Sequence, residues 1–367
     1  MSDSRVPASY RGAHVLVAGG GVAALEAAFA LRALAGDLVD IELLAPETVF
    51  LYRPQAVFEP FGGRRAQAFE LAELAGALGA QLTLGELASV DPGAHVARTA
   101  GGMTIPYAVL VVATGASPVA VLRDALTFRG PADGERAAAI AQSTDRSPLT
   151  LAIPSRRTWP LPIYELALGL RIVTDRPIAL ATVEPAPGTA LGEAGSSYLT
   201  SLLASRSIRL EVDVRFDRLA RGVTIAAPEL QAARIYGIPT DDDGFIPTGR
   251  FGEVVGVDDV HAAGDVTCSE VKHGSLAAGQ ADTVAEVIAA GAGAPVTPAP
   301  FRPILRARIA CGNDSIYVRR DLADPGDPGT VSSDPLWSPP AKIFARYLAP
   351  ALAGIARRNQ SPRFSWT

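Results

Sequence analysis

The chain has 367 residues, with 33 lysines and arginines against 38 acidic residues and a formal net charge of −5. This length predicts two or three domains with an ample core, and the acidic balance without a basic run argues against a nucleic-acid-binding surface. Two cysteines with no C-x-x-C motif argue against a disulfide scaffold and a zinc site, and we expect no metal at the acidic run 241–243, which lacks a histidine or spaced carboxylate partner.

The first thirteen residues, MSDSRVPASYRGA, lack the charged-then-apolar pattern of a signal peptide. No run of about 18 apolar residues is present to span a bilayer. We therefore expect a cytoplasmic protein, with peripheral contact to the inner face of the membrane as the alternative.

The stretch 14–28, HVLVAGGGVAALEAA, organises the chain. An apolar strand at 15–17 runs into Gly19, Gly21 and Ala24 at G-x-G-x-x-A spacing, and an alanine-rich helix follows. Gly19 permits the tight turn, Gly21 lets the backbone approach a pyrophosphate, and Ala24 lets the helix pack on the strand. The phosphates would bind amides at the positive end of the helix. This pattern predicts a dinucleotide site, against the alternative of a tight turn without ligand.

The rest of the first lobe is less specific. A strand at 40–44 should end near an acidic residue that binds the adenosine ribose. Glu47 is the nearest candidate, although a solvated turn carboxylate fits equally well. The loop 50–63 is rich in aromatic residues and proline and shows few helix or strand signals. A helix at 71–78 and a strand around 81–84 then lead to the apolar strand at 107–112.

Two later stretches decide which dinucleotide is bound. The first, YAVLVVATGASP at 107–118, ends its strand in Ala113, Thr114 and Gly115. The second, at 260–282, has a short strand ending in Gly264 and Asp265, and a helix that begins near Ser275.

Together, these three blocks resemble the two-dinucleotide-binding flavoprotein superfamily, of the pyridine nucleotide-disulfide oxidoreductase type. The resemblance implies an α/β fold with two Rossmann-like, doubly wound, three-layer domains and FAD in the first fingerprint. It also implies that Asp265 binds the ribityl chain and that the following helix points its N-terminus at the flavin. The implied flavin contacts are Gly19, Gly21, Val22, Ala23, Ala24, Glu47, Arg53, Pro54, Thr114, Gly115, Gly264, Asp265, Lys272 and Ser275.

The resemblance also implies a domain order. Residues 12–118 and 236–298 would form a discontinuous FAD domain, 119–235 a degenerate NAD-type domain, and 299–367 a C-terminal region that includes a helical, amphipathic segment. In the second domain, strands at 149–153, 177–183 and 208–212 alternate with helices at 161–170 and 196–203. Its phosphate turn reads PSRRTWP at 154–160, where neither proline supplies an amide and Trp159 is bulky. We therefore predict that this domain does not bind NAD(P) in the usual mode.

The altered phosphate turn at 154–160 is similar to the corresponding turn of sulfide:quinone oxidoreductases. RRTWPLPIYEL matches that family at Pro162, Tyr164 and Glu165. CGNDSIYV at 311–318 and the spacing of Trp337, Lys342 and Tyr347 resemble its C-terminal motifs.

That family carries two redox cysteines beside the flavin, but here Trp159 stands at the first position and only Cys311 can stand for the second. The resemblance implies catalytic roles for Cys311, Lys272 and Trp159, while Cys268 is an alternative thiol partner. Isolated cysteines can equally be small buried hydrophobes. Lys272 can stabilise negative charge on the flavin or be a plain surface lysine, and His273 can be a proton donor or a helix cap.

Two functions follow from these patterns. The first is an FAD-dependent oxidoreductase that moves electrons from a small-molecule donor to a quinone or other acceptor, without a usual NAD(P) site and without the full cysteine pair. The alternative is an FAD-binding protein with little turnover that serves as a partner or accessory subunit.

The segment 340–358 reads as an amphipathic helix that Pro350 should kink or divide. Its basic residues suit an anionic membrane interface, while intramolecular docking or a homodimer contact explains the same pattern. The residues on its expected apolar face are Ile343, Phe344, Tyr347, Leu348, Ala351, Leu352 and Ile355.

Overall fold

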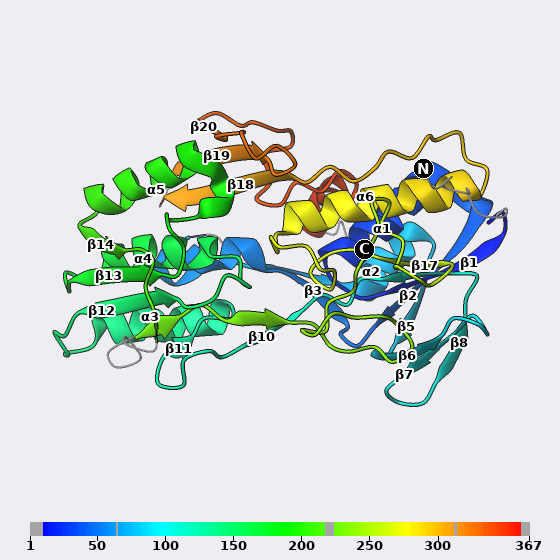
Figure 1. Cartoon of the computed structure of the whole chain (residues 1–367), viewed down its shortest axis with the longest axis horizontal. Helices are drawn as coiled ribbons and strands as arrows, with labels where there is room; N and C mark the ends of the chain where they lie inside the picture. The colour runs from blue at the N-terminus through cyan, green and yellow to red at the C-terminus, as the bar shows by residue number, and fades with distance from the viewer. Residues whose placement is uncertain (1–9, 64, 217–223, 312–313, 361–367) are drawn as a thin grey trace, which may run out of the picture.

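Two parallel sheets form two lobes that lie side by side (Figure 1). The computed structural model describes residues 10–63, 65–216, 224–311 and 314–360. The α/β fold with two Rossmann-like domains is confirmed. The domain boundaries proposed from the sequence remain predictions.

The first sheet has the order β17-β9-β1-β2-β5, and all its pairs are parallel. One face packs against helices and the other against a three-stranded antiparallel meander, so the helices in the described part of this lobe lie on one face. Val15 and Val17 point to the helices, whereas Leu16 and Ala18 point to the meander. Burial on both faces explains why these strands read as continuous apolar runs.

The elements of this lobe are β1 (Ala13–Ala18), α1 (Val22–Ala35), η1 (Gly36–Leu38), β2 (Val39–Ala45), α2 (Leu71–Leu78), β5 (Gln81–Leu84), β6 (Leu87–Asp91), β7 (Val96–Thr99), β8 (Thr104–Pro106), β9 (Val109–Val112), β17 (Val260–Ala262) and α6 (Gly274–Gly291).

The aromatic loop expected at 50–63 contains regular structure that the sequence did not reveal. β3 (Val49–Tyr52) pairs with β4 (Gln67–Glu70), and the 3-10 helix η2 (Arg53–Phe61) lies between them. The pairing is tertiary in origin, because Phe50 and Phe69 stack from opposite strands.

The second sheet has the order β11-β15-β12-β13-β14 and is also parallel. The strands and helices expected within 149–212 are confirmed. The antiparallel pair of β10 and β16 runs between the lobes (Figure 1). The elements are β10 (Ser117–Val119), β11 (Leu126–Thr127), α3 (Pro131–Gln142), β12 (Leu149–Ile153), α4 (Leu161–Val173), β13 (Ile178–Thr182), η3 (Thr189–Leu191), α5 (Gly192–Ser205), β14 (Ile208–Glu211), β15 (Ile225–Ala226) and β16 (Glu229–Gln231).

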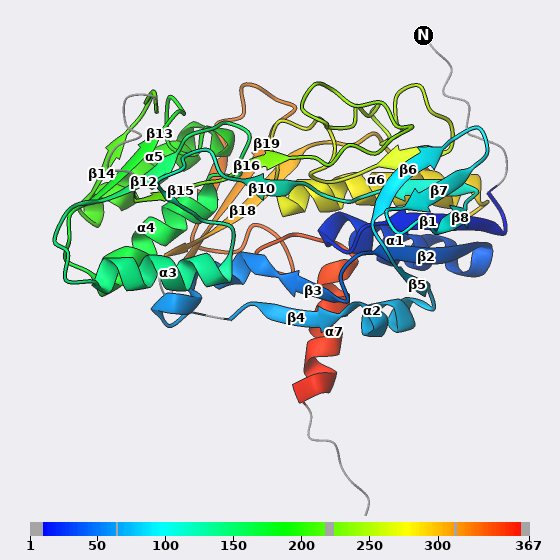
Figure 2. The same ribbon diagram turned by 90° about the horizontal axis from the view of Figure 1, so that it is seen from below.

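The C-terminal region begins with an antiparallel sheet of β18 (Ile304–Cys311), β19 (Asp314–Asp321) and β20 (Thr330–Ser332). Leu305, Ala307, Ile309 and Val318 pack on the core of the second lobe. The chain then returns to the first lobe and ends its described part in α7 (Leu348–Gln360), which extends away from the body below β4 (Figure 2).

The expectation of a helix over 340–358 that Pro350 kinks or divides is wrong. The helix begins only at Leu348, so Pro350 falls in its first turn, where backbone N–H groups have no intrahelical partner and proline is tolerated. Leu348, Leu352 and Ile355 are buried in the core of the first lobe together with side chains of α1 and α6. This geometry supports intramolecular docking of the apolar face. Within the described ranges, no helix is both long and apolar enough to cross a bilayer.

Removing buried methyl groups from α7 should weaken this docking. Leu352→Ala should lower the free energy of unfolding by about 2–4 kcal/mol, because the lost contacts leave a cavity against the first lobe. Ala353→Ser, at the neighbouring exposed position, should change it by less than about 0.5 kcal/mol. Urea unfolding of both variants is the measurement, and equal midpoints would refute the docked arrangement.

Candidate functional site

Gly19 follows β1 in a backbone conformation with φ +139°, which favours glycine. A Cβ at this position would lie 2.2 Å from the carbonyl oxygen of Ala113, just after β9, and 3.3 Å from the Cβ of Ala24. By contrast, a Cβ on Gly21 would meet nothing within 4 Å, and no side chain caps the start of α1. The turn thus combines a tight crossing with open space in front of helix amides, which fits a pyrophosphate.

The second flavin block packs against the first. Gly264, with φ +85°, follows β17, and a Cβ on it would lie 2.8 Å from the Cβ of Ala23. The side-chain oxygen of Gln280 accepts a hydrogen bond from the Gly264 N–H at 2.8 Å. Asp265 comes next; desolvation raises the pKa of its carboxyl group, partly opposed by Lys272, and no hydrogen bond from the described residues reaches it. This carboxylate can therefore accept hydroxyl donors of a ligand.

The remaining predicted flavin contacts lie around this crossing or beside it. Val22 opens α1, and Glu47 is exposed with an oxygen 3.8 Å from the position of a Cβ on Gly20. Thr114 is exposed, and Gly115, with φ +72°, continues the chain after β9. Arg53 and Pro54 open η2. As flavin contacts, all of these remain predictions.

Lys272 is a buried lysine whose ammonium group contacts residues of the protein itself. Its Nζ donates to the carbonyl oxygen of Thr267 and lies 3.8 Å from the centroid of the Phe245 ring. Burial lowers the pKa of Lys272, while the nearby Asp265 raises it. The interpretation of Lys272 as a plain surface lysine is therefore wrong, and its direct role at the flavin stays a prediction.

His273 is the N-cap of α6, as its Nδ1 accepts a hydrogen bond from the Ser275 N–H at 3.2 Å. Burial lowers the pKa of His273 to about 3, so the ring is neutral at physiological pH. The capping interpretation is confirmed. Trp159 packs edge-on against this ring with centroids 4.6 Å apart, which brings the turn 154–160 to the start of α6.

The sequence did not reveal that residues 341–347, here called the C-terminal strap, cover the start of α6. The Ile343 N–H donates to the Tyr52 hydroxyl and the Phe344 N–H to the Ser275 hydroxyl, each at 3.0 Å. Ser275 in turn donates to the carbonyl oxygen of Arg306 at 3.0 Å. The Ser275 hydroxyl is therefore engaged with the protein.

Lys342 of the strap forms a buried ion pair with Glu165 of α4, with 2.5 Å between Nζ and Oε2. The other Glu165 oxygen accepts the Ala310 N–H at 2.7 Å. Burial raises the pKa of Glu165, and both partners oppose this shift. Two residues singled out by the sulfide:quinone oxidoreductase resemblance thus meet across the two lobes.

The two cysteines are both free and sit in different surroundings. The exposed Cys268 thiol donates to Asp241 at 3.4 Å, and burial together with this bond raises its pKa to about 11. Cys311 ends β18; burial, then Glu165, raises its pKa to about 11 as well. Both are thiols rather than thiolates at neutral pH, which weakens the case for nucleophilic Cys311.

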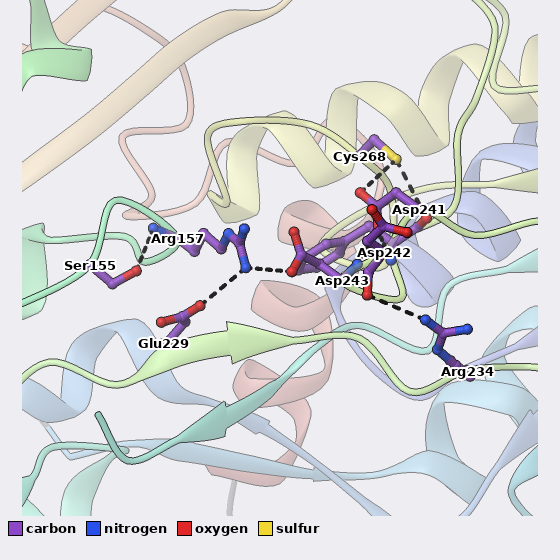
Figure 3. A network of polar contacts seen from close by, with 9 residues as sticks. Ser155, Arg157, Glu229, Arg234, Asp241, Asp242, Asp243 and Cys268 are labelled. Carbon is purple, nitrogen blue, oxygen red and sulfur yellow. Dashed lines mark hydrogen bonds and ion pairs between the residues drawn. The ribbon is translucent and has the colours of Figure 1, made fainter. Parts of the chain in front are cut away.

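A cavity of about 870 Å³ lies between the second lobe and the loops 241–245 and 268–272. Arg157, from the altered turn, spans it by pairing with Asp243 at 2.6 Å and with Glu229 at 3.4 Å (Figure 3). Asp241 accepts the Asp243 and Phe245 N–H groups. The acidic run therefore makes specific contacts within the protein. Over the described ranges, no group of three potential ligand side chains is placed to hold a metal.

Substitutions at the two glycines should separate folding from binding. Gly21→Val places its side chain in open space, so the protein should fold and lose at least about tenfold in dinucleotide affinity. Gly19→Ala should instead cost more than about 2 kcal/mol of stability, because its Cβ overlaps a backbone carbonyl. Gly76→Ala, on the open side of α2, is the control. Flavin content and thermal melting distinguish them, and full flavin retention by Gly21→Val would contradict the assigned site.

Alkylation of Cys268 should follow its raised pKa. Its rate with iodoacetamide should keep rising about tenfold per pH unit beyond pH 9, whereas an ordinary thiol levels off near its pKa of about 8.5. Mass spectrometry of the labelled peptide, with free glutathione as control, measures this. A plateau shared with glutathione would show that the hydrogen bond to Asp241 does not hold in solution.

Comparison with known proteins agrees with this geometry. Residues 13–147 match the model of the pyridine nucleotide-disulphide oxidoreductase family. A search of curated protein sequences gives no significant match. The fold is similar to that of the sulfide:quinone oxidoreductase from the hyperthermophilic bacterium Aquifex aeolicus, with TM-score 0.74, 19% identity and 87% of each chain covered.

Two further solved structures share the fold. The ferredoxin reductase for the CYP199A2 system from Rhodopseudomonas palustris has TM-score 0.65 and 19% identity, covering 84% of this chain and 83% of that one. The NADH:rubredoxin oxidoreductase from Clostridium acetobutylicum has TM-score 0.56 and 15% identity, covering 87% and 90%. Residues 13–147 thus match the pyridine nucleotide-disulphide oxidoreductase family, and the chain shares the fold of sulfide:quinone oxidoreductase.

Proposed function

We propose that the protein passes electrons from a small-molecule donor through FAD to a quinone or other acceptor, without using a pyridine nucleotide. The observation that carries this proposal is the state of the cavity between the lobes. It lies beyond Ile153 of β12 and beside Glu184, after β13, at the carboxyl ends of parallel strands where a second nucleotide would bind. The groups that would bind this second nucleotide already form hydrogen bonds or ion pairs within the protein.

The phosphate turn is the first engaged group. Pro154 and Pro160 supply no N–H, and the Arg157 N–H donates to the Ser155 hydroxyl at 3.1 Å. The Arg157 guanidinium is held by two carboxylates (Figure 3). A pyrophosphate would have to displace these partners and would still find too few amides.

The acidic residue expected to bind the adenosine ribose is the second engaged group. Glu184 follows β13, where an acidic residue would bind the adenosine ribose in a dinucleotide fold. Its carboxylate instead accepts the Gly188 N–H at 3.2 Å, the Thr189 N–H at 3.0 Å and the Tyr164 hydroxyl at 3.1 Å. Because its own loop uses these lone pairs, Glu184 is not free to bind a ribose.

FAD, when bound, supplies the chemistry of accepting and releasing electrons. The glycine turn and the first amides of α1 would hold its phosphates, and Asp265 its ribityl hydroxyls. The positive end of α6 would stabilise negative charge on the ring, and neutral His273 caps that end without adding charge.

A dithiol relay is not part of the proposal. Both thiols carry a pKa of about 11, and each is bonded to a different part of the protein. We likewise do not propose a membrane or homodimer contact through the apolar face of α7, because that face is buried against the first lobe.

Anaerobic mixing with a donor panel tests the function. Sulfide, a small thiol and a quinol should be compared with NADH and NADPH by bleaching of the flavin absorbance, followed by addition of a quinone or oxygen. We expect one small donor to reduce the flavin and both nucleotides to react more slowly than about 1 per second, the lower end of ordinary turnover. Faster reduction by NADH would refute the absence of a nucleotide site.

The same screen distinguishes the alternative function. If no donor bleaches the flavin while chemical reduction with dithionite succeeds, the FAD-binding accessory subunit becomes the better account.

A further inference from the structure

Two carboxylates from different helices lie together beneath the N-terminus of α7. Glu26 of α1 is fully buried, and its two oxygens accept the Tyr347 N–H at 2.9 Å and the Leu348 N–H at 2.6 Å. Asp282 of α6 is hydrogen-bonded to Glu26 through its side chain. Its Oδ1 is buried and has no hydrogen-bond partner among the described residues. Two carboxyl groups this close do not both ionise in a buried site, so they share one proton.

The geometry decides which group carries the proton. Glu26 receives two amide donors at the positive end of a helix, which stabilises its anion. Asp282 has no such donors and therefore acts as the donor to Glu26. In agreement, burial and then the charge of Glu26 raise the pKa of Asp282 to about 9.

Other titratable groups face the pair from α6, β18 and the strap, but none provides Asp282 with an equivalent partner. Glu286 raises and Arg346 lowers the pKa of Asp282, each less than Glu26 does. The groups around the pair are Glu286, Arg306, Arg346 and Tyr347.

The pair anchors the end of the C-terminal strap. The same short segment gives its amides to Tyr52 and Ser275 and its ammonium to Glu165. Loss of the anchor at Glu26 would leave these contacts without the fixed end that α7 provides.

We propose that Glu26 and Asp282 are positioning residues, which by sharing one proton hold the C-terminal strap against α1 and α6, so that the strap docks at neutral pH and is released in alkaline solution. Docked Asp282 binds its proton more tightly than exposed Asp282. The docked state therefore holds the extra proton between the ordinary pKa and about 9, and docking weakens as pH rises through this window. One proton changes the docking equilibrium at most tenfold per pH unit.

Limited proteolysis of the full-length protein tests this without reference to donor or acceptor. Cleavage within residues 338–348 by a broad-specificity protease is normalised at each pH to a free peptide of the same sequence. Normalised cleavage of the wild type should rise at least about tenfold from pH 7 to pH 10. Asp282→Asn keeps an N–H donor toward Glu26 but cannot titrate, so its cleavage should stay low and flat. Asp40→Asn removes an exposed charge of β2 and should follow the wild type.

Glu26→Gln removes the anion that binds the two amides, so its normalised cleavage should already be high at pH 7. A wild type without a pH response, or an Asp282→Asn variant that keeps the wild-type rise, would overturn the proposal. Because Asp282→Asn replaces a neutral acid by a neutral amide of the same shape, it should fold even if Glu26→Gln does not.

Discussion

The close approach of three chain segments at the carboxyl ends of β1, β9 and β17 is the constraint on which the site depends. Gly19 lies so near the carbonyl of Ala113 that no side chain fits between them, and a Cβ on Gly264 would lie only 2.8 Å from the Cβ of Ala23. Since these positions carry no Cβ, α1 begins directly at the crossing. The space in front of Gly21 is left open, and Asp265 directly follows Gly264 of the same crossing. Residues nearly 250 positions apart thus meet at one crossing, where we propose that FAD binds.

The C-terminal strap provides partners for two buried carboxylates, one in each lobe. Glu26 in the first lobe and Glu165 in the second are both almost inaccessible to solvent, and an unpaired carboxylate there would cost several kcal/mol. The strap supplies backbone amides to one and an ammonium group to the other. It therefore connects the two lobes by pairing with a buried carboxylate in each, and it covers the first turn of α6.

In the second lobe, the groups that would bind a nucleotide in this fold contact the protein instead. Its parallel sheet and helices retain the architecture of a nucleotide domain. Yet Arg157 links the altered turn to the first lobe, and Glu184 closes its own loop. Architecture depends on apolar periodicity across many residues, whereas binding depends on a few amides and one carboxylate. A domain can therefore lose binding and keep its architecture.

The sequence by itself determined the features that arise from short-range sterics and periodicity. The strand, glycine turn and helix at 13–35 and the strand 149–153 with the helix after it are local patterns, and each is present. The tertiary structure alone decided the contacts of distant groups: Glu26 with amides more than 320 positions away, Arg157 with Asp243, and the pairing of β3 with β4. It also placed the start of α7 at Leu348, because packing of the strap competes with the helical pattern that extends to residue 340. Periodicity specifies which face of an element is apolar, but it does not specify which distant carboxylate a free amide will meet.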